Sequence, residues 1–139
     1  MLKLGKPRTS KGLAVFCCKI AEEKLVSDIL ILDLTDIEHN PADFFVICTC
    51  EVENHLIAVA KEIDGKCKEL NIPLPRVEGL NKSSWALLDF FDVVIHLMLP
   101  NSRKYYKLEK LWGDAKFYQL NKDGKPRALK GDELRAFIN

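Results

Sequence analysis

The 139-residue sequence has no apolar run that approaches the roughly 18 residues needed to cross a lipid bilayer. It also lacks a charge excess, because 21 basic residues nearly balance 20 acidic residues and leave a net charge of +1. A protein that its own electric field holds to nucleic acid is usually much more basic. The sequence therefore argues against a membrane span and against nonspecific coating of RNA or DNA, but not against contact with one local surface.

The sequence has five cysteines, an odd count. An odd count without an apolar secretory segment fits a reducing compartment, so we predict a cytoplasmic location. Cys48-x-Cys50 with His39 or His55 would be a candidate metal site, but the gap between the cysteines is not that of a zinc knuckle. We predict no metal and no cofactor, and we expect the cysteines to pack as small hydrophobic residues.

The motifs of common active sites are missing as well. The sequence has neither a Gly-rich phosphate loop nor a G-x-S-x-G nucleophile elbow. The carboxylate pairs Asp33/Asp36 and Asp89/Asp92 lack the alternate spacing that places two side chains on one face of a strand for two-metal chemistry. We expect Asp89 and Asp92 to bond to backbone amides of their own turn. The sequence therefore predicts a protein that is not an enzyme.

The spacing of apolar residues predicts seven elements in the order α-β-β-α-β-β-α. The expected helices lie near residues 13–21, 56–70 and 100–112, and the expected strands near 28–33, 44–48, 85–88 and 93–99. Ser10 is a plausible cap for the first helix, and Gly113 closes the last one. This order predicts a single α/β layered domain with a mixed sheet flanked by helices.

Basic residues gather at both ends of the chain. Residues 1–12 carry four basic and no acidic residues, so we predict a basic N-terminal tail, with a truncated organelle-targeting peptide as the alternative. Residues 116–139 cluster lysine and arginine around Gly124 and Pro126, so we predict a loose basic extension that ends in a short helix. The domain itself is then expected to span residues 13–115.

Aromatic and charged residues are dense near the last predicted helix. Trp, Tyr and Arg carry much of the binding energy at protein interfaces. In one continuous helix, Tyr105, Leu108 and Trp112 would share a face at spacings of three and seven. Core packing explains such aromatics equally well. His96 lies inside a predicted strand, where it is either a hydrogen-bonded structural histidine or a polar contact for a partner.

Several short motifs follow one another at characteristic gaps. They are Ala42-Asp-Phe-Phe-Val-Ile47, Glu78-Gly79, Trp85-x-x-x-Asp89, Asp92-Val-Val-x-His96 and Arg103-x-Tyr-Tyr106-x-Leu-Glu109-x-Leu-Trp112. Each is weak alone, but the ordered set is specific. Over about residues 13 to 115 the chain resembles the ribosomal silencing factor family, also called the Iojap family.

The resemblance implies a monomer or homodimer of one α/β domain, distantly similar to nucleotidyltransferases but without their catalytic carboxylates. It implies binding to the large ribosomal subunit, chiefly to a ribosomal protein of the L-fourteen type. The bound factor would block joining of the small subunit and so repress translation, and the basic tails would touch ribosomal RNA at the periphery. Assembly of the large subunit through the same contact is an alternative, and a nucleotidyltransferase-like enzyme is another.

Carried onto this sequence, the resemblance implies a set of partner-binding residues. They are Trp85, Asp89, His96, Tyr106, Leu108, Glu109 and Trp112. Trp85 would be the aromatic anchor, and Asp89 and Glu109 would form ion pairs with basic groups of the partner. Arg103 is expected to pair with a carboxylate of its own domain. Phe91 stands where the family usually has glycine, so we expect any positive-φ backbone at this position to be replaced by another conformation.

Overall fold

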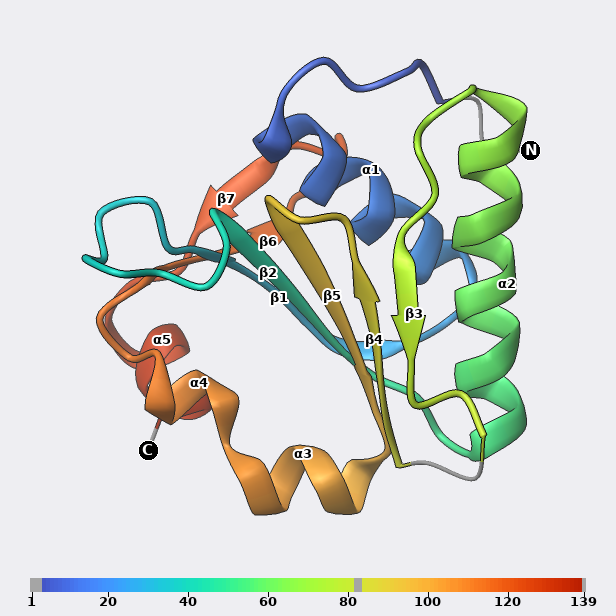
Figure 1. Ribbon diagram of the computed structural model, residues 1–139. Coiled ribbons are helices and arrows are strands. Elements are labelled where there is room, and N and C mark those ends of the chain that lie inside the picture. The colour runs from blue at the N-terminus through green and yellow to red at the C-terminus, as the bar shows by residue number, and fades with distance from the viewer. Residues whose placement is uncertain (1–3, 82–83, 139) are drawn as a thin grey trace.

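The structure is a computed structural model that describes residues 4–81 and 84–138 (Figure 1). Its helices are α1 (Ser10–Glu23), α2 (Glu53–Glu69), α3 (Pro100–Tyr106), α4 (Leu108–Leu111) and α5 (Gly131–Ile138). Its strands are β1 (Ser27–Asp33), β2 (Phe44–Thr49), β3 (Arg76–Glu78), β4 (Trp85–Asp89), β5 (Val93–Met98), β6 (Lys116–Leu120) and β7 (Pro126–Ala128). The seven elements predicted from the sequence are all present, although the last predicted helix is divided in two.

The strands of the described residues form one sheet in the order β3-β4-β5-β2-β1-β6-β7. β2 and β5 run parallel, so that Phe45 lies beside Val94 and Ile47 beside His96. The other neighbouring strands are antiparallel. A sheet with both strand directions and with helices against it confirms the predicted mixed α/β domain.

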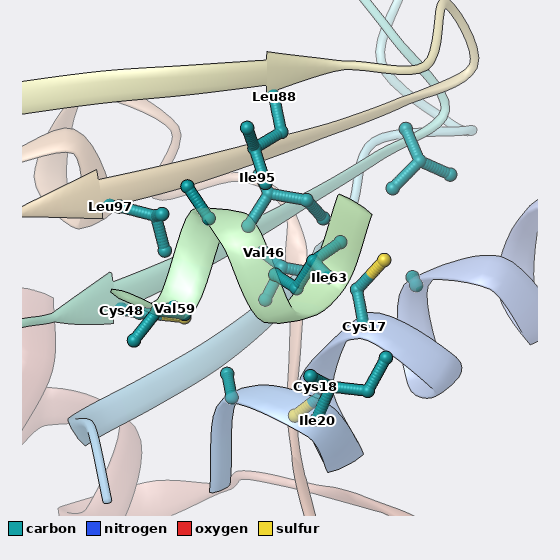
Figure 2. Close-up of a cluster of buried hydrophobic side chains, with 14 of the residues drawn as sticks. Cys17, Cys18, Ile20, Val46, Cys48, Val59, Ile63, Leu88, Ile95 and Leu97 are labelled. Atoms are coloured by element: carbon teal, nitrogen blue, oxygen red, sulfur yellow. The ribbon is translucent and has the colours of Figure 1, made fainter. Parts of the chain in front are cut away.

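Helices α1 and α2 cover one face of the sheet (Figure 1). Side chains alternate along a strand, so Phe44, Val46 and Cys48 of β2 point towards these helices. In Figure 2, Ile63 of α2 lies over Val46 and Ile95 in the resulting core. Each large apolar side chain buried in this way contributes about 1.5 to 3 kcal/mol. This core fixes the sheet on which the rest of the molecule is built.

The five cysteines are free and buried in the same core. Burial raises the pKa of the Cys18 thiol to about 12 and that of Cys67 to about 11. Burial also raises the pKa of Cys17 and Cys48 well above its usual value. Protonated thiols are poor nucleophiles and poor metal ligands. The prediction that these residues pack as small hydrophobic side chains is therefore confirmed.

The opposite face of the sheet is covered only in part. At one end, α4 and α5 pack with buried residues of the strands, among them Leu32, Phe45 and Phe117. No helix covers this face fully near β4 and β5. Leu87 and Val94, which lie on it, are therefore only half-buried. The sheet therefore has one closed face and one partly open face.

The last predicted helix breaks at Lys107. This residue has a left-handed φ of 49°, and its backbone N–H donates to the carbonyl of Arg103 at 3.2 Å as α3 ends. Tyr105 lies before the break, whereas Leu108 and Trp112 lie after it. The prediction that these three residues share one helical face is therefore wrong.

The prediction of a loose extension after residue 115 does not agree with the structure. β6 pairs antiparallel with β1, with Tyr118 beside Ile31, and β7 pairs with β6. Phe117 is 2% exposed and Leu129 is 4% exposed, so both belong to the core. The basic residues that suggested a tail, such as Lys122, Lys125 and Arg127, lie between these apolar positions. They are exposed to solvent on the β6–β7 turn and on β7.

Residues 4–12 are also more ordered than a tail. α1 begins at Ser10, and its cap is Thr9, whose hydroxyl oxygen accepts from the backbone N–H of Gly12 at 2.9 Å. Leu4 packs against the α1–α2 core. The helix therefore begins inside the predicted tail. Residues 1–3 of that tail and Asn139 of the predicted extension lie outside the described residues.

The turn between β4 and β5 keeps a positive-φ backbone although it has no glycine. Phe91 has a φ of 76°, and its side chain is 84% exposed. The backbone N–H of Phe91 donates to Oδ1 of Asp89 at 2.7 Å, which confirms the predicted role of Asp89 in the turn. The expectation that loss of glycine redraws this backbone is wrong, because the tight antiparallel connection requires the conformation whichever residue occupies it.

Candidate partner-binding surface

An aromatic cluster occupies the partly open face of the sheet. We define it as Phe45, Trp85, His96, Tyr105, Tyr106 and Trp112. The rings of Trp85 and Tyr106 are 4.7 Å apart between centroids, and those of Tyr105 and Tyr106 are 4.9 Å apart. Phe45 extends the cluster by edge contacts with His96 at 4.5 Å and with Trp112 at 5.9 Å. Strand alternation explains the arrangement, because Phe45, Trp85 and His96 come from adjacent strands and share one face.

His96 is the polar centre of the aromatic cluster. The indole N–H of Trp85 donates to Nδ1 of His96 at 3.1 Å, which makes Nδ1 an acceptor and leaves the proton of a neutral ring on Nε2. That Nε2 is buried and has no hydrogen-bond partner among the described residues. Burial, with a smaller effect from the Arg103 charge, lowers the pKa of His96 to about 4. The imidazole is therefore neutral at ordinary pH, in keeping with the predicted structural histidine.

A buried ion pair anchors the helix that carries the two tyrosines. Nε of Arg103 donates to Oε1 of Glu109 at 2.6 Å, and Nη1 of Arg103 donates to the hydroxyl of Thr49 at 2.8 Å. Both charged side chains are about nine-tenths buried. Thr49 ends β2, so Arg103 joins α3 to the sheet and to α4 at once. The prediction that Arg103 pairs with a carboxylate of its own domain is confirmed.

The predicted site residues divide by exposure. Tyr106 is 50% exposed, while Trp85 and Trp112 are half-buried at the rim of the aromatic cluster. In contrast, Leu108 and Glu109 are only 6% and 7% exposed. The sequence resemblance implies that Glu109 forms an ion pair with a basic group of the partner. That role does not agree with its burial against Arg103. His96 is buried as well, so it supports the surface from beneath.

Asp89 lies apart from the aromatic cluster. It stands at the far end of β4 from Trp85, although alternation places both residues on the same sheet face. Its carboxylate holds the turn at Phe91. The structure therefore brings Trp85, His96, Tyr106 and Trp112 together but not Asp89.

The predicted set of site residues omits three residues of this region, although Tyr105 is among the aromatic residues that the sequence places near the last predicted helix. Tyr105 is 79% exposed beside Tyr106, Phe45 links His96 to Trp112, and Thr49 holds Arg103. Alternation within the run 44–49 carries a signal for Phe45 and Thr49, since both follow the period that points to this face. No local signal distinguishes Tyr105, because its exposure depends on where α3 breaks.

The groups considered for metal or acid–base chemistry have other partners. Oδ1 of Asp33 accepts from the backbone N–H and the hydroxyl of Thr35. Nδ1 of His55 accepts from the backbone N–H of Glu51, and its Nε2 lies 2.7 Å from the carbonyl of Lys24. Across residues 4–81 and 84–138, no group of three or more His, Cys, Asp or Glu residues is arranged to hold a metal ion. In the same part of the chain, no helix is long and apolar enough to cross a membrane.

Together, these features define a single-domain α/β protein with an aromatic surface on one partly open sheet face. The family model described as "Ribosomal silencing factor during starvation" matches residues 7–136. The Ribosomal silencing factor RsfS of Bacillus subtilis is 36% identical over 111 residues, which cover 80% of this chain and 93% of that protein. The chain belongs to the ribosomal silencing factor family.

Two further relatives extend the comparison. A crystal structure of a Chromobacterium violaceum protein has a TM-score of 0.71 at 28% identity and covers 76% of this chain and 88% of that one. A mouse protein named "Mitochondrial assembly of ribosomal large subunit protein 1" is 36% identical over 88 residues, which cover 61% of this chain and 38% of that protein. The family resemblance predicted from the sequence motifs is confirmed.

Proposed function

We propose that this protein binds the large ribosomal subunit through a ribosomal protein of the L-fourteen type and keeps the small subunit from joining. Membership in a family named for ribosomal silencing supports the partner and the outcome. The observation that supports this surface is the exposed pair Tyr105 and Tyr106. Tyr106 packs against Trp85, and Tyr105 packs edge-on against Tyr106, over a sheet face that the helices leave partly open. The mechanism is steric: the protein occupies a shared surface and no bond is made or broken.

The aromatic surface suits protein recognition because it is held in place before binding. Arg103 fixes α3 to Thr49 and Glu109. The rings of Trp85 and Tyr106 are restrained by their mutual contact. An interface built from rigid side chains loses less conformational entropy on binding than one built from free side chains. Asp89, on the same face at the far end of β4, is proposed to meet a basic group at the rim of the contact.

The basic residues near the C-terminus are proposed to make a peripheral contact with ribosomal RNA. Arg127 is already paired with Glu133, since both terminal nitrogens of its guanidinium donate to the carboxylate at 2.9 Å. Lys122, Lys125 and Lys130 therefore remain for phosphate groups. Such contacts weaken with added salt.

Assembly of the large subunit is a second candidate function, because one relative is named for it in mitochondria. Assembly and silencing use the same proposed contact. They differ in whether the protein binds an immature or a mature large subunit. Depletion of the protein in its own cells separates them. Accumulation of immature large subunits indicates assembly, whereas mature subunits that join too freely during starvation indicate silencing.

A subunit-joining assay tests the proposed function. Purified large subunits are incubated with the protein, small subunits are added, and joining is followed by light scattering. We expect joining to fall as the protein is added, and to recover when Trp85→Ala replaces the wild type. Undiminished joining at saturating protein would exclude the steric mechanism.

A further inference from the structure

A pocket lies on the side of α3 away from the aromatic cluster, and the proposed ribosome contact leaves it unused. Its volume is about 490 Å³, within the range of small-molecule sites. The start of β1, the end of β2, α3, α4 and the last turn of α5 supply its walls. Figure 1 shows α3, α4 and α5 together below the sheet. The pocket therefore joins segments from both halves of the chain.

Cationic side chains dominate the lining of this pocket. Its charged residues are Arg103, Lys104, Lys107, Lys110, Asp28 and Glu109. The charge of Glu109 is already balanced by its ion pair with Arg103. Among the other charged residues that line the pocket, three are lysines and one is Asp28, so positive charge is in excess. This balance favours an anionic ligand, and several cations around one cavity favour a multiply charged one.

Arg103 supplies a rigid donor to the pocket. Its side chain is about nine-tenths buried, and its Nε and Nη1 atoms are committed to Glu109 and Thr49. Its remaining terminal nitrogen, Nη2, takes part in neither of these two hydrogen bonds, and the side chain lines the pocket. A guanidinium fixed through two of its nitrogens is a rigid donor, and its third nitrogen suits a phosphate oxygen.

Part of the pocket lining is apolar. It consists of Pro100 at the start of α3 and of Ala136, Phe137 and Ile138 at the end of α5. A ligand that fills the pocket therefore needs an anionic group at one end and a ring or other apolar body at the other. Nucleoside phosphates have this combination, with the phosphate suited to the lysines and the base suited to Phe137.

We propose that this pocket binds a small nucleoside phosphate, with its phosphate at Arg103, Lys104 and Lys110 and its base against Phe137. The inference goes beyond the proposed ribosome contact and does not depend on it, because binding is measured on the isolated protein. Phosphates of RNA share the chemistry of the proposed ligand, so the experiment includes both sources.

Isothermal titration of the full chain with ATP, GTP, inorganic pyrophosphate and adenosine, and separately with an RNA oligonucleotide, tests this pocket. We expect the three phosphate compounds to bind at concentrations up to about 1 mM, a range that reveals even weak specific sites, and adenosine not to bind. The charge-reversed pair Lys104→Glu and Lys110→Glu is expected to weaken binding by at least about tenfold, because attraction becomes repulsion. The neutral pair Lys104→Gln and Lys110→Gln is expected to have an intermediate effect.

A matched pair of substitutions controls for net charge. Lys61→Glu and Lys68→Glu reverse two exposed lysines of α2 outside the pocket lining and should leave binding within about twofold of the wild type, since distant charges are screened. Thermal unfolding verifies that each variant is folded. Three results would overturn the proposal: no binding of any phosphate compound, equal losses in the pocket and control pairs, or binding of an RNA oligonucleotide alone.

Discussion

Phe91 shows how one residue can keep a backbone conformation that it disfavours. Its φ of 76° lies in the left-handed region, where a side chain costs about 1 to 2 kcal/mol. Because the ring is 84% exposed, its removal sacrifices little burial. The absence of glycine suggested a redrawn turn, but the demand for positive φ comes from the pairing of β4 with β5, which the local sequence does not show.

Phe91→Gly should therefore stabilise the protein. We expect the free energy of unfolding to rise by about 1 kcal/mol, because glycine adopts positive φ without the steric cost. Urea denaturation measures the change. Phe91→Ala is the control, since alanine removes the ring but keeps the strained backbone, and equal stability of the two variants would contradict the explanation.

The buried imidazole of His96 should make stability depend on pH. The folded state takes up the proton only near its pKa of about 4, whereas the unfolded state takes it up near 6.5. The unfolded state thus binds more protons between these values, and the contribution of His96 to stability, full above pH 6.5, falls as pH drops towards 4. The loss is at most about 3 to 4 kcal/mol, since each pKa unit corresponds to about 1.4 kcal/mol.

Chemical denaturation of the wild type and of His96→Gln between pH 7 and pH 5 measures this effect. Glutamine has no titrating group, so the variant should lose less stability than the wild type across that window. Carboxylates contribute equally to both proteins and cancel in the difference. Identical pH profiles would show that the folded protein admits a proton at His96 without penalty.

A substitution of Glu109 distinguishes a structural role in the ion pair with Arg103 from a role in contacting a partner. Glu109→Gln should destabilise the protein by about 3 to 5 kcal/mol, because it leaves the charge of Arg103 buried without a counter-charge. The double variant Arg103→Met with Glu109→Met should be less destabilised than this single variant, since no uncompensated charge remains. Unfolding in urea compares the variants. A neutral effect of Glu109→Gln would favour the exposed role that the family resemblance suggested.

At the scale of elements, the sequence predicts what depends on local periodicity. The stripe of apolar residues in α2 and the buried runs of β2 and β5 place these elements correctly. The break after α3 escapes local reasoning, because its left-handed position is occupied by Lys107 and not by the glycine or asparagine that usually marks a helix end. Strands β6 and β7 are not predicted, because basic residues stand among their few apolar positions and obscure the alternation typical of a strand.

Phe117→Ala tests whether β6 belongs to the core. The side chain is 2% exposed, so its truncation should cost about 3 to 5 kcal/mol through lost burial and a new cavity. Thermal and urea unfolding measure the cost. Lys122→Ala, in the exposed turn that follows β6, should change stability by less than about 0.5 kcal/mol. Equal and small effects would restore the interpretation of residues 116–139 as a loose extension.

For the whole molecule, the two faces of the sheet have different tasks. α1 and α2 close one face over the cysteine-containing core, while the other face stays partly open and carries the aromatic cluster. Ordered motifs in the sequence predict the family and three of the four residues of the aromatic cluster that reach the surface, namely Trp85, Tyr106 and Trp112. They do not separate these from Leu108 and Glu109, because exposure is decided by the three-dimensional course of the chain after Lys107.

The most direct test of the proposed function is sedimentation of the protein with separated ribosomal subunits. The double variant Tyr105→Ala and Tyr106→Ala removes the exposed aromatic pair, and Leu25→Ala removes an equally exposed apolar side chain at the end of α1, on the other face. We expect the wild type and Leu25→Ala to sediment with the large subunit only, and the double variant to remain free although folded. A wild-type protein that stays free of large subunits at micromolar concentration would contradict the proposed function, and a double variant that still sediments would place the contact elsewhere.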